Sequence, residues 1–192
     1  MSSSRSGYPT RVLLICGALA AMHVLLHLAT VGLLTVLAPL SPPLYGLAAS
    51  VHGLMPFLAR RLTRTPGTAT ITAGVSGVMV AALSPSGVIV LVPLLLTGLV
   101  IDLAVWRADR DGIDGKGAES RYFVAAVVLG AVLFGVSLSV FSPEHLTPAL
   151  VLGTLATRVV GEVVVAAASG ALARGLRRAG VGAESMRRNV EA

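Results

Sequence analysis

Residues 12–37 have the sequence VLLICGALAAMHVLLHLATVGLLTVL, a run of 26 residues without a charged side chain. As an α-helix, this run would be about 39 Å long at about 1.5 Å per residue, which is enough to cross a hydrocarbon core about 30 Å thick. Arg5 and Arg11 precede the run, as basic residues precede the core of a signal peptide. A signal-peptide core has only about 7–15 apolar residues, however, and Pro39 follows closely here. We therefore predict a retained first transmembrane span.

The composition extends this interpretation to the whole chain. Of the 192 residues, 55% are hydrophobic and 12% are charged, and the mean hydropathy is +0.85. A soluble domain carries about 25% charged residues, so a water-soluble fold of this length could not hide so much apolar surface. The single cysteine, Cys16, excludes a disulfide framework and a cysteine-based metal site. We expect one multi-pass domain in the cytoplasmic membrane, with no second, soluble domain.

Prolines, glycines and charged residues divide the remaining sequence into further apolar segments. The expected spans after the first are 44–59, 67–83, 88–106, 122–141 and 148–173. Prolines at positions 39, 42 and 43 break the first helix, whereas Pro148 suits the first turn of the last one. The predicted fold class is an all-α, six-helix transmembrane bundle over residues 12–173, with a polar tail at 1–11 and a basic tail at 174–192.

The basic residues predict how this bundle is oriented. If the N-terminus is cytoplasmic, the inside segments are the two tails and the loops 60–66 and 107–121. These segments hold 14 of the 15 lysines and arginines, and the outside turns hold none; the remaining one, Arg158, lies within the sixth span. An excess of basic residues in cytoplasmic loops is typical of membrane proteins. We predict that both termini are cytoplasmic, which accounts for the net charge of +6 without nucleic-acid binding.

Small residues recur four positions apart on several of the expected spans. These residues are Gly17 with Ala21 on the first span, Gly46 with Ser50 on the second, and Gly153, Thr157 and Gly161 on the sixth. Membrane helices pack closely where small residues allow their backbones to approach. The pattern therefore predicts either packing inside the bundle or a docking face for another membrane subunit, and loop polarity does not separate these alternatives.

Ionisable residues at membrane depth are few, and they are candidates for function because burying them is costly. Asp102 lies in the inner half of the fourth span, close enough to the interface to pair with a loop arginine. Arg158 and Glu162 are four residues apart on the sixth span and therefore share a helix face. They either neutralise each other or provide a polar contact for a ligand. In the second case the Arg158 guanidinium would bind an anionic or carbonyl oxygen group.

Three histidines lie within the first two spans. His23 and His27 are four residues apart on the first span, and His52 lies on the second. Together with Met22 and Met55 they include ligand types that bind soft metals. This spacing is also common by chance. We predict neutral histidines that are hydrogen-bonded between helices, with no metal site and no cofactor.

One short motif suggests an enzyme. Residues 74–77, Gly-Val-Ser-Gly, match the GxSG motif of rhomboid intramembrane serine proteases, which also have a six-helix core. A serine nucleophile needs a histidine base within hydrogen-bond reach, and the rhomboid base lies on the sixth helix. Here Ser76 is on the third span, and the sixth span contains no histidine. The motif therefore indicates a packing site, and the absence of a nucleotide-binding motif places any energy source on another chain.

Three local segments resemble a known family of membrane proteins. Residues 65–69, TPGTA, follow a basic loop and resemble the KPGAA segment that opens the third helix of YkoE-type S components of energy-coupling factor (ECF) transporters. Residues 96–102, LTGLVID, resemble the QGLGAE segment of that family, with Thr97 in place of Gln and Asp102 in place of Glu. Residues 168–174, ASGALAR, with the following Gly-Val, resemble its C-terminal ending.

This resemblance implies a small-molecule binding subunit with partners. S components bind a small water-soluble vitamin on the outer side of the membrane. They dock on a transmembrane coupling (T) subunit through small residues of the first helix, and two ABC ATPase subunits power release inside. Carried over, Gly17 and Ala21 lie near the docking face. Glu144 and His145, in the last outer turn, and Arg158 with Glu162 are substrate-binding candidates by position.

The sequence therefore leads to one main hypothesis and one alternative. The hypothesis is an S component, without enzymatic activity of its own, that captures a thiamine-related vitamin or precursor. The alternative is a structural or scaffolding membrane protein that uses the same small-residue faces for assembly and has no ligand. A self-contained carrier is disfavoured because the sequence shows no clear inverted repeat or paired broken helices.

Overall fold

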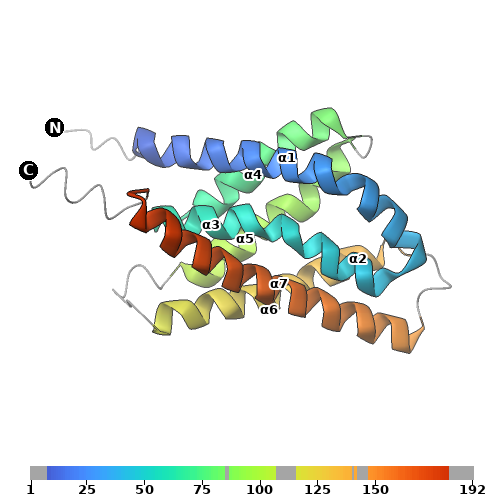
Figure 1. Cartoon of the computed structure of the whole chain (residues 1–192). Coiled ribbons are helices and arrows are strands. Elements are labelled where there is room, and N and C mark those ends of the chain that lie inside the picture. Colours follow the sequence, from blue (N-terminus) through green and yellow to red (C-terminus); the bar gives the residue numbers. More distant parts are fainter. Residues whose placement is uncertain (1–7, 85–86, 107–115, 140, 142–146, 182–192) are drawn as a thin grey trace, which may run out of the picture.

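The protein is all-helical, and the computed structural model describes residues 8–84, 87–106, 116–139, 141 and 147–181. The elements in chain order are α1 (Thr10–Leu40), α2 (Pro42–Ala49), the 3₁₀ segment η1 (Ser50–Gly53), α3 (Leu54–Thr63), α4 (Thr68–Leu83), the 3₁₀ segment η2 (Gly87–Val90), α5 (Leu91–Val105), α6 (Lys116–Leu138) and α7 (Pro148–Arg178). α2, η1 and α3 follow one another directly and form the second span, and η2 leads directly into α5. The six predicted helical segments are therefore confirmed, and Figure 1 shows them as one bundle.

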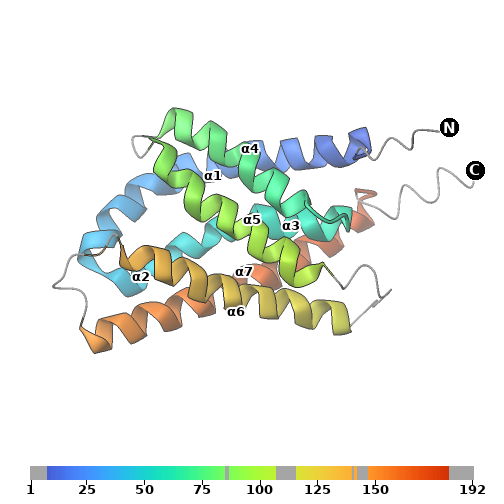
Figure 2. The ribbon, with the colours of Figure 1, turned by 180° about the vertical axis from the view of Figure 1, so that it is seen from behind.

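The start of the first span and the end of the last one meet at the same end of the bundle. Near the start of α1, Nη2 of Arg11 donates to the carbonyl of Gly180, 3.3 Å away and just beyond α7. The Tyr8 hydroxyl donates to the carbonyl of Pro66, which follows α3, at 2.9 Å. Figures 1 and 2 show the first turns of α1 and the last turns of α7 side by side at this end. The positive-inside prediction requires this arrangement, because it brings the basic ends of three spans together.

The outward surface of the bundle is apolar. Four helices are long and apolar enough to cross a membrane, over Thr10–Leu40, Gly87–Val105, Gly117–Leu138 and Pro148–Arg178, and α4 is a shorter apolar helix. In each of the four, no more than 33% of the most apolar stretch is buried inside the bundle. Outward leucines such as Leu14 and Leu103 are 68% and 70% exposed. Lipid is the solvent that accommodates such a surface, so the structure is that of a multi-pass membrane protein.

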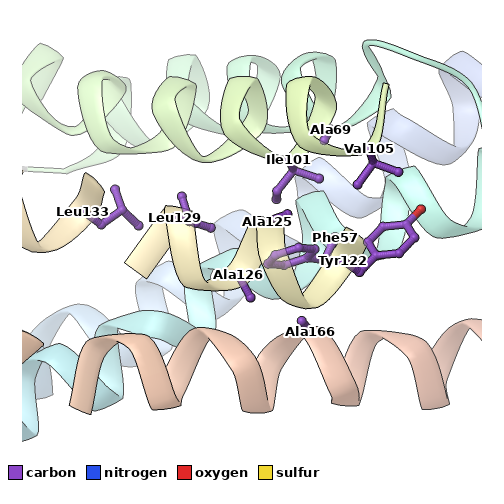
Figure 3. Packing of buried hydrophobic residues seen from close by; sticks show 10 residues of the cluster. All are labelled: Phe57, Ala69, Ile101, Val105, Tyr122, Ala125, Ala126, Leu129, Leu133 and Ala166. Atoms are coloured by element: carbon purple, nitrogen blue, oxygen red, sulfur yellow. The ribbon is translucent and has the colours of Figure 1, made fainter. Parts of the chain in front are cut away.

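The largest apolar core lies where α5, α6 and α7 meet the second span. Figure 3 shows its ten buried side chains: Phe57, Ala69, Ile101, Val105, Tyr122, Ala125, Ala126, Leu129, Leu133 and Ala166. Four of the ten are alanines, and small side chains allow membrane helices to approach closely. At one end of this core, the Arg61 guanidinium lies 3.9 Å from the centre of the Tyr122 ring. The core thus passes directly into a polar layer at the basic end of the bundle.

Glycines make the closest contacts between neighbouring helices. A Cβ atom added at Gly98 on α5 would lie 2.5 Å from the Cα atom of Thr70 on α4. One added at Gly130 on α6 would lie 2.8 Å from the Cα atom of Val159 on α7. Both distances are too short for a real carbon pair, and the neighbouring atoms belong to the backbone. These two positions therefore accept only glycine at the observed helix separation.

Replacing Gly98 with alanine is expected to lower the free energy of unfolding by about 1–3 kcal/mol, the usual cost of overpacking a core. The new methyl group would meet backbone atoms of Thr70, which cannot rotate away. Gly17→Ala is the matched control, because nothing lies within 4 Å of a Cβ atom added there and alanine favours helix more than glycine does. Unfolding by SDS in mixed micelles measures both variants. Equal stability of the two variants would contradict the close contact between α4 and α5.

Three helices extend beyond their predicted ends. α1 continues through Pro39 to Leu40, α6 begins at Lys116 instead of residue 122, and α7 continues to Arg178 instead of residue 173. The prediction of a loop that extends to residue 121 is therefore wrong. Charged residues do not end a helix at the membrane edge, and Glu119 in the first turn of α6 interacts favourably with the helix dipole. Helices predicted from hydropathy alone are too short, because their charged turns are assigned to loops.

Candidate functional site

Arg158 and Glu162 lie on the face of α7 that packs against the second span. Nη2 of Arg158 is 3.5 Å from Oε1 of Glu162, and the two side chains are 8% and 0% exposed. Their spacing of four residues on one helix brings the side chains together, as the sequence predicted. The pair thus lies within a transmembrane helix and is enclosed by protein, where a charged group is costly unless it has a partner.

The second span departs from α-helical geometry opposite this ion pair. The 3₁₀ segment η1 begins at Ser50, whose hydroxyl donates to the Gly46 carbonyl at 2.9 Å and to the Arg158 carbonyl at 3.3 Å. Nη1 of Arg158 in turn donates to the Gly46 carbonyl at 3.4 Å. A serine hydroxyl that bonds four residues back perturbs a helix, and a 3₁₀ stretch inside a helix often marks a functional position. Arg158 is therefore held against the irregular part of the second span.

Small residues bring the second span against α7. A Cβ atom added at Gly161 would lie 2.5 Å from Oγ of Ser50, and one added at Gly46 would lie 3.3 Å from the carbonyl oxygen of Thr154. The small-residue patterns predicted on these two spans therefore face each other inside the bundle. For these residues the packing alternative is confirmed, and they do not form a docking face.

On its other side, η1 contacts α1 through the three histidines. The ring centroid of His52 is 5.4 Å from that of His23 and 5.3 Å from that of His27. Nε2 of His52 lies 3.5 Å from Oγ1 of Thr30 on α1. Met22, a ligand in the soft-metal alternative, is 52% exposed on the outer side of α1. Within the described parts of the chain, no three His, Cys, Asp or Glu residues are grouped so that they could hold a metal ion.

We call His23, His27, His52, Arg158 and Glu162 the polar cluster. Most of its polar atoms make no hydrogen bond to the protein: both ring nitrogens of His23, Nε2 of His27, Nδ1 of His52, Nε of Arg158 and both carboxylate oxygens of Glu162. The predicted hydrogen bonding of histidines between helices is thus limited to the contact of His52 with Thr30. Each buried polar group without a hydrogen bond costs about 1–3 kcal/mol. Such a cluster inside a membrane domain therefore indicates a functional site.

The substrate-binding prediction also included Glu144 and His145. Both residues lie outside the described residues, shortly before α7 begins at Pro148. Their assignment stays a prediction from the sequence. The structure brings the other two predicted residues, Arg158 and Glu162, together and adds the three histidines, which the sequence did not connect to them.

The predicted docking residues lie on the outer face of α1. Gly17 and Ala21 are both exposed, whereas Cys16 and Ala20 point into the bundle and are 1% and 0% exposed. Nothing lies within 4 Å of a Cβ atom added at Gly17. This small-residue pair therefore has no packing role inside the bundle, unlike the pairs on the second and sixth spans.

Asp102 belongs to a separate, structural group at the basic end of the bundle. Nε of Arg60 is 3.2 Å from Oδ1 of Asp102, and the two side chains are 0% and 7% exposed. Oδ2 of Asp102 accepts hydrogen bonds from the backbone N–H and the hydroxyl of Thr70, at 2.8 and 2.7 Å. The sequence placed Arg60 in a loop, which is wrong: Arg60 and Arg61 are buried in α3, and the loop begins at Arg64 with a positive φ of 50°. The carboxylate thus joins three helices.

Ser76 of the GxSG motif takes part in helix packing. Its hydroxyl is fully buried and donates to the Ala73 carbonyl on the same helix, at 3.1 Å. A Cβ atom added at the neighbouring Gly77 would lie 2.9 Å from the side chain of Leu91 on α5. The motif therefore provides close contact between α4 and α5, as the sequence predicted.

Comparison with known proteins identifies the fold. No protein-family model and no curated protein matches the sequence. The structure matches the crystal structure of an S-component of an ECF transporter with a TM-score of 0.81, over 96% of this chain and 95% of that chain, at 19% sequence identity. The protein therefore has the membrane S-component fold.

Proposed function

We propose that this protein is the substrate-binding S component of an ECF-type importer. The observation that carries the proposal is the structural match, which extends over nearly the whole of both chains with a TM-score of 0.81. The polar cluster supports it, because it offers hydrogen-bonding groups to a small molecule deep in the bundle. The protein is then a binding subunit and not an enzyme, and ATP hydrolysis takes place on partner subunits.

The polar cluster limits what kind of substrate fits. Arg158 supplies donors for an anionic or carbonyl oxygen, Glu162 supplies acceptors, and a neutral imidazole supplies one donor and one acceptor. A small polar compound with both kinds of group satisfies this set, and Glu144 and His145 would contact it from the outer side. The three local sequence resemblances favour a thiamine-related vitamin or its hydroxymethylpyrimidine precursor as the first compound to test.

The test has a partner arm and a ligand arm. The tagged protein is purified from its native membranes in mild detergent, and the proteins recovered with it are identified by mass spectrometry. We expect a transmembrane T subunit and two ABC ATPase subunits, and in the second arm binding of one compound of a vitamin panel without ATP. Recovery of neither partner nor ligand, with well-folded protein, would instead favour a structural membrane protein.

The outer face of α1 is the expected docking surface. Replacing Gly17 and Ala21 together with leucine should abolish recovery of the T subunit, because small residues at such a surface allow helices to approach closely. Ligand binding should persist, because both residues are exposed and point away from the bundle. Ala167→Leu adds the same kind of bulk to an exposed position on α7 and is the matched control. Unchanged recovery from the α1 double variant would move the docking surface elsewhere.

A further inference from the structure

A pocket lies between the end of α5 and the first turns of α6, away from the polar cluster. Its volume is about 360 Å³, and it is lined by Leu103 and Ala104 of α5, by Trp106, which directly follows α5, and by Arg121 of α6. Figure 2 shows the two helix ends next to each other. Val105 at the end of α5 and Tyr122 near the start of α6 belong to the same apolar core, as Figure 3 shows. The pocket therefore lies where these two helix ends meet.

The pocket lies where the transmembrane span ends. The apolar span that contains α5 ends at Val105, and Trp106 follows it directly. Leu103 is 70% exposed on the outward surface, and Trp106 is 43% exposed. Tryptophan is enriched at the level of the lipid headgroups, and leucine faces the acyl chains. The pocket wall thus changes from apolar to polar over a single helical turn.

The charge at this end of the bundle favours an anion. Eight arginines of the described chain lie there: Arg11, Arg60, Arg61, Arg64, Arg121, Arg174, Arg177 and Arg178. The described acidic residues at this end are Asp102 and Glu119, and these are already bound to Arg60 and Arg61. A guanidinium has five N–H donors and binds phosphate through two parallel hydrogen bonds. The Arg121 guanidinium, which lines the pocket, is therefore suited to donate hydrogen bonds to a phosphate.

We propose that this pocket binds an anionic phospholipid, with its phosphate at Arg121 and Trp106 and an acyl chain along Leu103. Basic pockets between transmembrane helices on the cytoplasmic side are suited to anionic headgroups. Free phosphate would use the guanidinium but leave the apolar wall unused, whereas a phospholipid uses both parts. The proposal does not depend on the transport function, because the pocket is separate from the polar cluster and from the outer face of α1.

The protein contains its own probe for this site. Trp106 is the only tryptophan in the sequence, so its fluorescence reports on the pocket alone. The full chain is reconstituted in mixed vesicles of phosphatidylglycerol and phosphatidylcholine, with one or the other lipid carrying brominated acyl chains, which quench tryptophan on contact. At equal mole fractions we expect about a fivefold preference for the anionic lipid, the effect of one arginine at an anionic surface.

Two variants with the same change in charge separate the pocket from the general attraction of a basic surface. Arg121→Gln should abolish the preference. Arg178→Gln, at the exposed end of α7, should retain it. If Arg121→Gln does not fold, Ala104→Phe fills the pocket instead, and it should also abolish the preference. Circular dichroism establishes that each variant is folded.

Three results would overturn the proposal. The first is equal quenching by the two brominated lipids in the unmodified protein. The second is a preference that persists in the folded Arg121→Gln or Ala104→Phe variant. The third is loss of the preference when inorganic phosphate is added at constant ionic strength, which would identify free phosphate as the occupant.

Discussion

Replacing Asp102 with alanine will lower the free energy of unfolding by about 3–5 kcal/mol, the cost of removing one partner of a buried ion pair. The change takes the carboxylate away from the Arg60 guanidinium, whose side chain is 0% exposed. It also removes the acceptor of two hydrogen bonds from Thr70, at 2.8 and 2.7 Å. Unfolding by SDS in mixed micelles measures the loss. Asp102→Asn should lose less, because its amide oxygen still accepts from Thr70.

Glu119→Ala is the matched control for this prediction. Glu119 forms an ion pair with Arg61 at 2.7 Å, but its side chain is 37% exposed. Solvent screens such a pair, so its removal should cost about 1 kcal/mol or less. Arg61 also keeps its hydrogen bond to the Ala166 carbonyl, at 3.1 Å, and its position over the Tyr122 ring. Equal losses from Asp102→Ala and Glu119→Ala would mean that burial of the Asp102 pair contributes nothing extra.

The fold could be predicted from the sequence because each span is specified locally. A run such as 12–37 is long and apolar enough to cross a bilayer by itself, and the basic residues between spans distinguish the two sides. The incorrect assignment of Arg60 and Arg61 to a loop also results from this reliance on local sequence. A prediction from hydropathy assigns an arginine to a loop. A buried arginine is nevertheless stable inside a helix when a carboxylate from another helix faces it. That carboxylate, Asp102 or Glu119, is distant in sequence and does not affect the local pattern.

The candidate site was predictable only where one helix holds both partners. Arg158 and Glu162 are close because they are four residues apart on α7, and this needs no tertiary information. The approach of His52 to His23 depends on how the second span is positioned along α1, and on the change to 3₁₀ geometry at η1. A signal for this irregular segment was present: Ser50 lies four residues after Gly46, and its hydroxyl bonds to the Gly46 carbonyl.

Removing the charge pair of the polar cluster should separate its role in binding from its role in stability. Arg158→Met leaves the Glu162 carboxylate buried without the guanidinium that lies 3.5 Å away, so this variant should lose stability. Adding Glu162→Gln removes the remaining charge, and the double variant should regain most of the lost stability. Replacing a buried ion pair by neutral groups is often nearly neutral for stability.

Affinity for the vitamin identified in the panel should behave differently. A hydrogen bond to a charged group contributes about 1.5–3 kcal/mol, so Arg158→Met should weaken binding by about 10–100-fold. The double variant should stay at least as weak, because neither methionine nor glutamine restores a cation to the site. Binding measured by titration calorimetry, beside unfolding in mixed micelles, follows the two properties separately. If the double variant regains affinity together with stability, the Arg158–Glu162 pair contributes only to the stability of the fold. Lost affinity in a stable double variant instead means that Arg158 contacts the substrate, because the neutral pair no longer disturbs the packing of α7 against η1.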